Sequence, residues 1–245
     1  MSARKPTPLI VLRSLLFAVW VYLVLAGVGL LFLPTLLCPP RIVLIPAHLW
    51  ARLIAWGLRV IVGVRIETRG LEHRPAGAAL IASKHQGMLD IVVPYQMVGQ
   101  PCFVLKQELM RLPLFGWYCN RLGMIPVDRS AGSAALRSLV GASRQRIAEG
   151  RQIIIFPEGT RKAIGAPPDY KPGIAALYRE MALPVTPMAT NSGECWPAKG
   201  FIRYPGVVVF EFLPPIPPGL KRASFMTALE NSIETASAAL VSSGR

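Results

Sequence analysis

Residues 9–33 form an almost uninterrupted apolar stretch, which only Arg13 and Ser14 break. At about 1.5 Å per residue, a helix of this stretch would be about 37 Å long, enough to cross the hydrocarbon core of a bilayer. The stretch exceeds the apolar part of a typical signal peptide, and no A-x-A cleavage site follows it. We therefore expect a membrane anchor; the alternative is a buried helix of a soluble protein.

A second hydrophobic segment, about residues 42–64, follows several prolines. Spacings of four and seven residues place His48, Arg52 and Arg59 on one face of a helix. This pattern predicts an amphipathic helix lying in the membrane interface, and a second full span with its arginines reaching the headgroups remains open. We expect residues 1–58 to form a two-helix membrane-anchoring hairpin.

The charge of the chain favours a membrane surface as partner. Lys and Arg number 27 against 13 Asp and Glu, which gives a net charge of +14. Such a charge suits nucleic acid or anionic lipid. The mean hydropathy of +0.43 favours lipid, and the sequence shows no zinc-finger spacing or basic-aromatic patch that would indicate nucleic acid.

Basic residues near the N-terminus predict the orientation. Arg4, Lys5 and Arg13 favour a cytoplasmic N-terminus. A hairpin, or two helices half-inserted in the inner leaflet, would then leave residues 59–245 facing the cytoplasm. The four cysteines lack paired spacing, which fits reduced thiols on the cytosolic side of the membrane.

Beyond about residue 59, strand-like and helical segments alternate. Helices are expected at 133–149, at 171–181 and after the proline-rich stretch 214–218. This alternation predicts an α/β domain, residues 59–245, with a mostly buried mixed sheet flanked by helices. The expected strands are 60–68, 78–83, 102–105, 124–127, 152–156, 184–189 and 207–213.

The second of these strands ends in Ser-Lys-His-Gln-Gly-Met-Leu-Asp, so that His85 is followed by a carboxylate, Asp90, five residues later. On a continuous helix, residues five apart lie about 140° from each other. The two side chains can meet only if the chain turns, and Gly87 permits a turn. In such a pair the carboxylate holds one ring nitrogen as N–H and leaves the other free to accept a proton.

The expected strand at 152–156 is followed by a second set of candidate site residues: Glu158, Gly159, Thr160 and Arg161. These residue types suit a polyol that carries a phosphate. A guanidinium binds phosphate through two parallel hydrogen bonds, and glycine lets the backbone approach a ligand. The alternatives are that Glu158 caps a helix and that Arg161 forms a surface ion pair.

His-x4-Asp followed by Phe-Pro-Glu-Gly-Thr-Arg resembles the glycerolipid acyltransferase family, specifically the 1-acyl-glycerol-3-phosphate acyltransferases. Residues 106–129 and 183–189 resemble two further blocks of that family, and the likeness covers roughly residues 65–215. The first block departs from the common form, because Lys84 and Gly87 stand where the family usually has Asn and Ser.

The resemblance implies transfer of a fatty acyl group from an acyl thioester, either acyl-CoA or acyl-carrier protein, to the sn-2 hydroxyl of lysophosphatidic acid, which gives phosphatidic acid. His85 would be the general base and Asp90 would orient it. The resemblance implies no cofactor, and His85 has no second His or Cys at a spacing that would bind a metal. The expected substrate-binding residues are Glu158, Gly159, Thr160, Arg161, Arg129 and Lys106.

Three other functions stay open. The departures at Lys84 and Gly87 allow another lysolipid acceptor, such as a lyso-ornithine lipid. A membrane lipase or esterase would need a nucleophile, and the chain has no G-x-S-x-G elbow. A non-catalytic membrane lipid-binding protein would keep its function in a His85→Ala variant.

Overall fold

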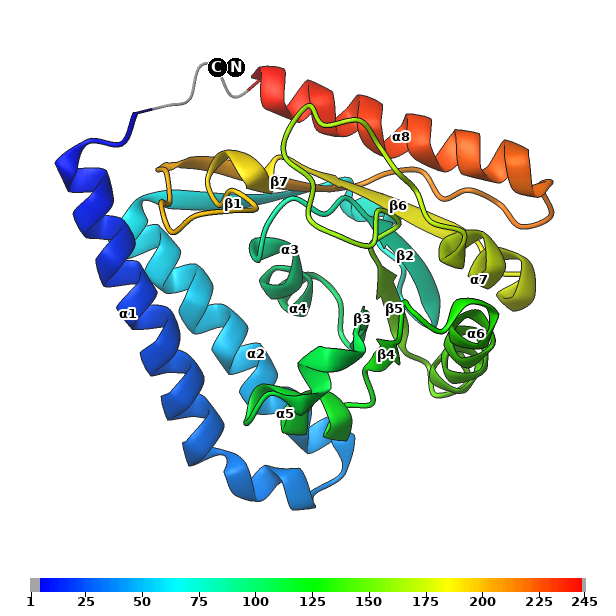
Figure 1. The fold of residues 1–245 in the computed structure, drawn as a ribbon, viewed down its shortest axis with the longest axis horizontal. Helices are drawn as coiled ribbons and strands as arrows, with labels where there is room; N and C mark the ends of the chain where they lie inside the picture. The colour runs from blue at the N-terminus through cyan, green and yellow to red at the C-terminus, as the bar shows by residue number, and fades with distance from the viewer. Residues whose placement is uncertain (1–4, 244–245) are drawn as a thin grey trace.

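The computed structural model describes residues 5–243, so Arg4 lies outside the described residues. Two long helices come first and lie side by side, α1 (Pro8–Leu31) and α2 (Pro40–Gly57) (Figure 1). Each begins with proline in its first turn, where the missing N–H has no intrahelical partner to lose. A 3-10 turn, Leu33–Leu37, joins them.

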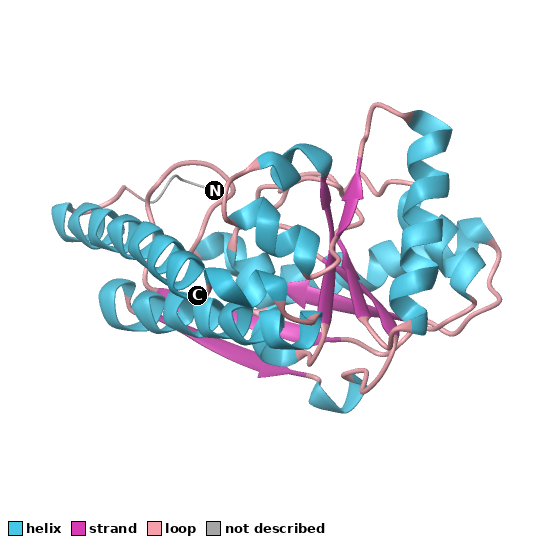
Figure 2. Ribbon diagram, turned by 90° about the horizontal axis from the view of Figure 1, so that it is seen from below, coloured by secondary structure: helices cyan, strands magenta, loops and turns pink. Residues whose placement is uncertain are grey.

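A seven-stranded sheet follows, in the order β1-β7-β6-β2-β5-β3-β4. All neighbouring strands are parallel except β6 and β7, which are antiparallel, so the expected mixed sheet is confirmed. The sheet is strongly twisted, and strands at its two ends point in different directions in Figure 2. The strands are β1 (Val64–Arg69), β2 (Ala79–Ser83), β3 (Pro101–Lys106), β4 (Ile125–Val127), β5 (Gln152–Ile155), β6 (Val185–Thr190) and β7 (Gly206–Phe212).

The predicted strand 60–68 is wrong at its start. The helix α2 continues as a π-helical turn, Leu58–Val62, which ends at Gly63 in the left-handed conformation (φ 86°). The strand β1 therefore begins only at Val64. A run of apolar residues suits a buried helix end as well as a strand, and this is why the pattern misplaced the boundary.

Helices cover both faces of the sheet (Figure 1). The alternation along β2 shows this, because Ile81 packs in the same cluster as residues of α1 and α2, whereas Leu80 and Ala82 pack with residues of α6, α7 and α8. Short 3-10 turns lie at Leu71–His73, Gln107–Arg111 and Ser192–Glu194. The remaining helices are α3 (Leu89–Val92), α4 (Pro94–Met97), α5 (Phe115–Arg121), α6 (Gly132–Ala148), α7 (Gly173–Met181) and α8 (Arg222–Ser243).

The first helix has two different sides. Its buried side includes Phe17, whose ring meets that of Trp196 edge-on at 5.4 Å between centroids. Its other side leaves Leu12, Leu16 and Leu23 more than half exposed. By length and composition, α1 and the segment Pro40–Val62 are each long and apolar enough to cross a membrane. The protein thus offers a large apolar surface that its own core does not cover.

Candidate active site

The strand β2 ends directly before the His-x4-Asp motif, and a turn brings His85 and Asp90 together. The Nδ1 atom of His85 lies 2.9 Å from Oδ2 of Asp90. Asp90 sits in the first turn of α3, and Gly87 lies in the turn between the two side chains. The expected turn is therefore present, and the two side chains meet as their residue types suggested.

The Asp90 carboxylate is completely buried, and the groups that contact its two oxygens can all donate a hydrogen bond. Besides His85, its Oδ2 accepts the backbone N–H groups of Gln86 at 2.6 Å and Gly87 at 2.8 Å. Its Oδ1 accepts the hydroxyl of Ser192 at 2.5 Å. The two backbone N–H groups can only donate, so Oδ2 acts as an acceptor and Nδ1 of His85 is the ring nitrogen that carries its N–H toward it. The Nε2 atom is then the ring nitrogen that can accept a proton.

The position of Gly87 has a steric cause. A Cβ atom added there would overlap the backbone oxygen of Trp196, closer than real Cβ contacts allow. The segment around Trp196 packs against this turn, and Gly193 N donates to Oε1 of Gln86 at 3.0 Å. Glycine at position 87 therefore lets the chain segment from 192 to 196 close over the His–Asp turn.

One face of the His85 ring is covered by Phe156, with ring centroids 3.9 Å apart and planes 17° from parallel. Phe156 also lines an apolar cavity with a volume of about 100 Å³. The cavity lies between the N-terminal helices and the sheet. Its lining includes Val28, Trp50, Ile91, Tyr95, Phe103, Leu105 and Tyr118. The histidine thus stands at a boundary between a polar turn and an apolar space.

The structure places Glu158 behind His85. Its side chain is fully buried; Oε2 accepts the backbone N–H of His85 at 3.2 Å, and Oε1 accepts the ammonium of Lys84 at 2.8 Å. Burial raises the pKa of the Glu158 carboxyl above its ordinary value, while Lys84 opposes that rise. Both oxygens have partners inside the protein, so Glu158 supports the histidine from within the domain.

The other residues of this loop lie nearer to solvent. Gly159 has a left-handed backbone (φ 65°), which favours glycine, and a Cβ added there would come within 3.9 Å of the Arg129 guanidinium carbon. Thr160 and Arg161 are exposed. The next residue, Lys162, donates its backbone N–H to the carbonyl of His85 at 2.8 Å. The loop therefore lies next to the His85–Asp90 turn, and the Arg129 guanidinium lies close to Gly159.

Lys106 ends β3, two strands away from β2. Its ammonium forms an ion pair with Glu108 at 2.9 Å, and both side chains are at least half exposed. The charge of Lys106 therefore has an acidic neighbour, unlike Arg129 and Arg161, which form no ion pair within residues 5–243.

Arg203 is a basic residue near the site that no sequence pattern indicated. Its guanidinium carbon stacks 4.5 Å from the ring centroid of Trp196, and its backbone N–H donates to the buried hydroxyl of Ser14 in α1 at 2.8 Å. Burial, with a contribution from nearby Arg161, lowers the pKa of Arg203 to about 10. No motif marks this arginine, because its place depends on how α1 and the segment from 196 to 203 pack.

Residue types and spacing also did not indicate the partners of Lys84. This lysine is almost completely buried and contacts Glu234 of α8 as well as Glu158. Within the described chain, no group of three or more His, Cys, Asp or Glu is placed to hold a metal ion.

Comparison with known proteins gives matches over the same part of the chain. Residues 65–191 match the acyltransferase family model. The chain is 38% identical over 159 residues to a 1-acyl-sn-glycerol-3-phosphate acyltransferase of Pseudomonas aeruginosa, which covers 65% of this chain and 62% of that protein. It is 27% identical over 169 residues to the human 1-acyl-sn-glycerol-3-phosphate acyltransferase alpha, with 68% and 60% covered.

The fold is similar to that of the 1-acyl-sn-glycerophosphate (LPA) acyltransferase PlsC from Thermotoga maritima. The TM-score is 0.77 at 20% identity, and the match covers 94% of this chain and 97% of that one. The fold is therefore that of a glycerolipid acyltransferase. The chain belongs to the acyltransferase family, which confirms the resemblance seen in its sequence blocks. The alignments span about three fifths of the curated relatives, 62% and 59% of the first two.

Proposed function

We propose that this protein transfers a fatty acyl group from an acyl thioester to the sn-2 hydroxyl of lysophosphatidic acid, which gives phosphatidic acid. The observation that carries this proposal is the His85–Asp90 pair at 2.9 Å, whose imidazole ring stacks on Phe156 in the wall of an apolar cavity. The names of the relatives support the same acceptor.

In the proposed reaction, Nε2 of His85 removes the proton from the acceptor hydroxyl while the oxygen attacks the thioester carbonyl. Asp90 keeps the Nδ1 proton in place and stabilises the imidazolium that forms. The tetrahedral intermediate then expels the thiolate, which takes the proton from His85. The acceptor hydroxyl is itself the nucleophile, so no acyl-enzyme forms.

The apolar cavity suits the acyl chain. Its wall is built from side chains of α1, α2 and the sheet, and Phe156 places one part of that wall against the His85 ring. A chain bound there would bring its thioester carbonyl to the edge of the ring. Burial of methylene groups contributes about 0.8 kcal/mol each, so an apolar pocket favours a fatty acyl substrate.

The phosphate of the acceptor fits the basic groups beside the same turn. Arg129 and Arg161 lie on or next to the Gly159 loop, and Arg203 lies near Arg161. In residues 5–243 none of these three arginines is neutralised by a carboxylate. A phosphate monoester would supply the missing negative charge, with Gly159 and Thr160 close to it and Lys106 adding positive charge from β3.

We infer that residues 1–58 anchor the protein in the membrane and that residues 59–245 work at its cytoplasmic surface. The exposed leucines of α1 support insertion, and the net charge of +14 supports attraction to anionic lipid. Acyl-CoA and acyl-carrier protein, the two donors that the family uses, are both available on that side. The hairpin also packs on the domain, since Phe17 shares a hydrophobic cluster with Phe210 of β7.

The test offers the purified full-length protein three acceptors side by side: lysophosphatidate, lysophosphatidylcholine and lyso-ornithine lipid. We expect preference for lysophosphatidate, because only the phosphate monoester has both a compact dianion and a free glycerol hydroxyl. His85→Ala should abolish transfer to every acceptor. An active His85→Ala protein refutes the mechanism, and preference for lyso-ornithine lipid moves the assignment to that acceptor. Inactivity of the wild type with all donors would favour a lipid-binding protein.

A further inference from the structure

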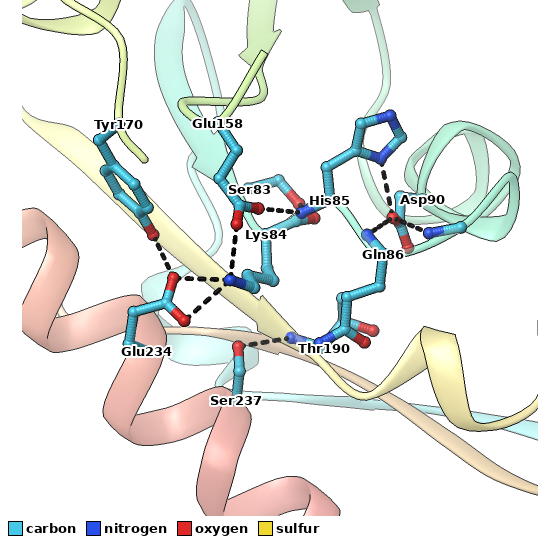
Figure 3. A network of polar contacts seen from close by, with 11 residues as sticks. Ser83, Lys84, His85, Gln86, Asp90, Glu158, Tyr170, Thr190, Glu234 and Ser237 are labelled. Atoms are coloured by element: carbon cyan, nitrogen blue, oxygen red, sulfur yellow. Dashed lines mark hydrogen bonds and ion pairs between the residues drawn. The ribbon is translucent and has the colours of Figure 1, made fainter. Parts of the chain in front are cut away.

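The side chain of Lys84 lies inside the protein, directly before the catalytic histidine. It is only 4% exposed. Its Nζ atom donates to Oε1 of Glu158 at 2.8 Å and to both oxygens of Glu234 at 2.7 and 2.8 Å (Figure 3). All three protons of the ammonium are therefore used by two carboxylates.

Glu234 comes from α8, far along the chain from the motif. This helix packs on the sheet through Phe225, Leu229 and Ile233, all fully buried. Glu234 lies next to that apolar side, and Tyr170 donates its hydroxyl to Oε1 at 2.9 Å. Burial and the nearby Glu234 raise the pKa of Tyr170, so its hydroxyl stays a donor. The carboxylate is thus held toward Lys84 from two sides.

A continuous line of contacts leads from α8 to the active site. Glu234 binds Lys84, Lys84 binds Oε1 of Glu158, and Oε2 of Glu158 accepts the backbone N–H of His85 at 3.2 Å (Figure 3). Without Glu234, the ammonium would have only one carboxylate left to bind. It would then draw on both oxygens of Glu158 and compete with the His85 N–H.

We propose that Glu234 is a positioning residue for acyl transfer, which neutralises Lys84 and, through Lys84 and Glu158, fixes the backbone of His85. Asp90 orients the ring, whereas this second network sets where the ring is placed. The pairing also accounts for the departure at position 84, because a buried lysine requires an acidic partner where an asparagine does not. The inference rests on the proposed function, since it assigns a role relative to the base His85.

The experiment measures steady-state kinetics of the full-length protein with lysophosphatidate and acyl-CoA. Glu234→Ala should lower kcat by about tenfold to a hundredfold, the effect of a small misplacement of a catalytic group. The KM values for both substrates should stay within twofold, because Glu234 touches neither. Glu234→Gln, which keeps one oxygen for Lys84, should recover part of the loss.

Glu230→Ala is the matched control. Glu230 lies one turn earlier on α8 and is half-buried, and it forms no ion pair with the described residues. Its removal should leave kcat unchanged. Tyr170→Phe removes one donor to Glu234 without changing charge, so it should lower kcat in the same direction by a smaller factor. Tyr170→Phe therefore tests the same network if the Glu234→Ala protein does not fold.

A double-mutant cycle tests the route. In a Lys84→Met background, Glu234→Ala should cause no further loss of kcat, because the line of contacts is already broken. Additive losses would overturn the inference, as would Glu234→Ala molecules that melt earlier yet keep the wild-type kcat. His85→Ala separates the two claims: if it is inactive while Glu234→Ala is fully active, only this inference fails, and if it is active, the proposed function fails.

Discussion

Replacing Gly87 by serine, the residue that the family usually has there, should damage this protein. A Cβ at position 87 would overlap the carbonyl oxygen of Trp196, which is backbone and cannot rotate away. The two segments would have to move apart by several tenths of an ångström. The same movement lengthens the hydrogen bond of 2.8 Å from Gly87 N to Asp90. The change therefore acts on both stability and the His–Asp turn.

The magnitude follows from these two effects. Forcing extra atoms into a packed site costs about 1–3 kcal/mol. For a chain of this size each kcal/mol shifts the melting temperature by about 2–4 °C, so we expect Gly87→Ser to melt about 2–12 °C lower. The kcat should fall further than the loss of folded protein explains, because a weakened contact to Asp90 disturbs the orientation of His85.

The assay combines thermal unfolding in detergent with acyl transfer measured well below the melting transition. Gly77→Ala is the matched control, since a Cβ at Gly77 meets nothing within 4 Å. It should leave both measurements near wild type. A Gly87→Ser protein with unchanged melting temperature and kcat would refute the steric argument, because it would show that Trp196 does not press on the turn.

Four further variants and one extraction assay test the rest of the site. Asp90→Asn should lower kcat by at least about a hundredfold at unchanged KM, because the amide favours the wrong tautomer of the histidine. Replacing Arg161 or Arg203 by lysine should raise the acceptor KM and leave the donor KM unchanged, because an ammonium cannot form the two parallel hydrogen bonds that a guanidinium forms with phosphate. Equal effects on the KM values of both substrates would argue against phosphate binding. Leu105→Trp, which narrows the apolar cavity, should shift the preference toward shorter acyl chains, and an unchanged profile would remove the acyl chain from that cavity. High salt should not release the full-length protein from anionic vesicles, whereas release by salt alone would show that α1 is not inserted.

Much of the architecture was predictable because it depends on local patterns. Each buried strand is a short apolar run bounded by turn residues, and six of the seven expected strands lie within one residue of their predicted bounds. The predicted face of the last helix is also confirmed, with Phe225 and Leu229 fully buried. The His-x4-Asp spacing was informative for the same reason, since both residues belong to one turn.

The remaining parts of the site depend on contacts between distant segments. Ser192 reaches Asp90 across 102 positions, and Glu234 reaches Lys84 across 150. Residue types and spacing do not show which helix will lie over the end of a strand, so they could not supply a partner for Lys84.

The sequence by itself determined the His85–Asp90 pair and the two apolar helices, because hydrophobic length and motif spacing are properties of the chain. Only the tertiary structure decided that Glu158 faces inward to His85 and Lys84, that Gly87 lies under Trp196, and that β7 runs antiparallel to β6. These features follow from the packing of whole elements. The effect of a buried charge or of a missing Cβ on the fold depends on the atoms that pack around it.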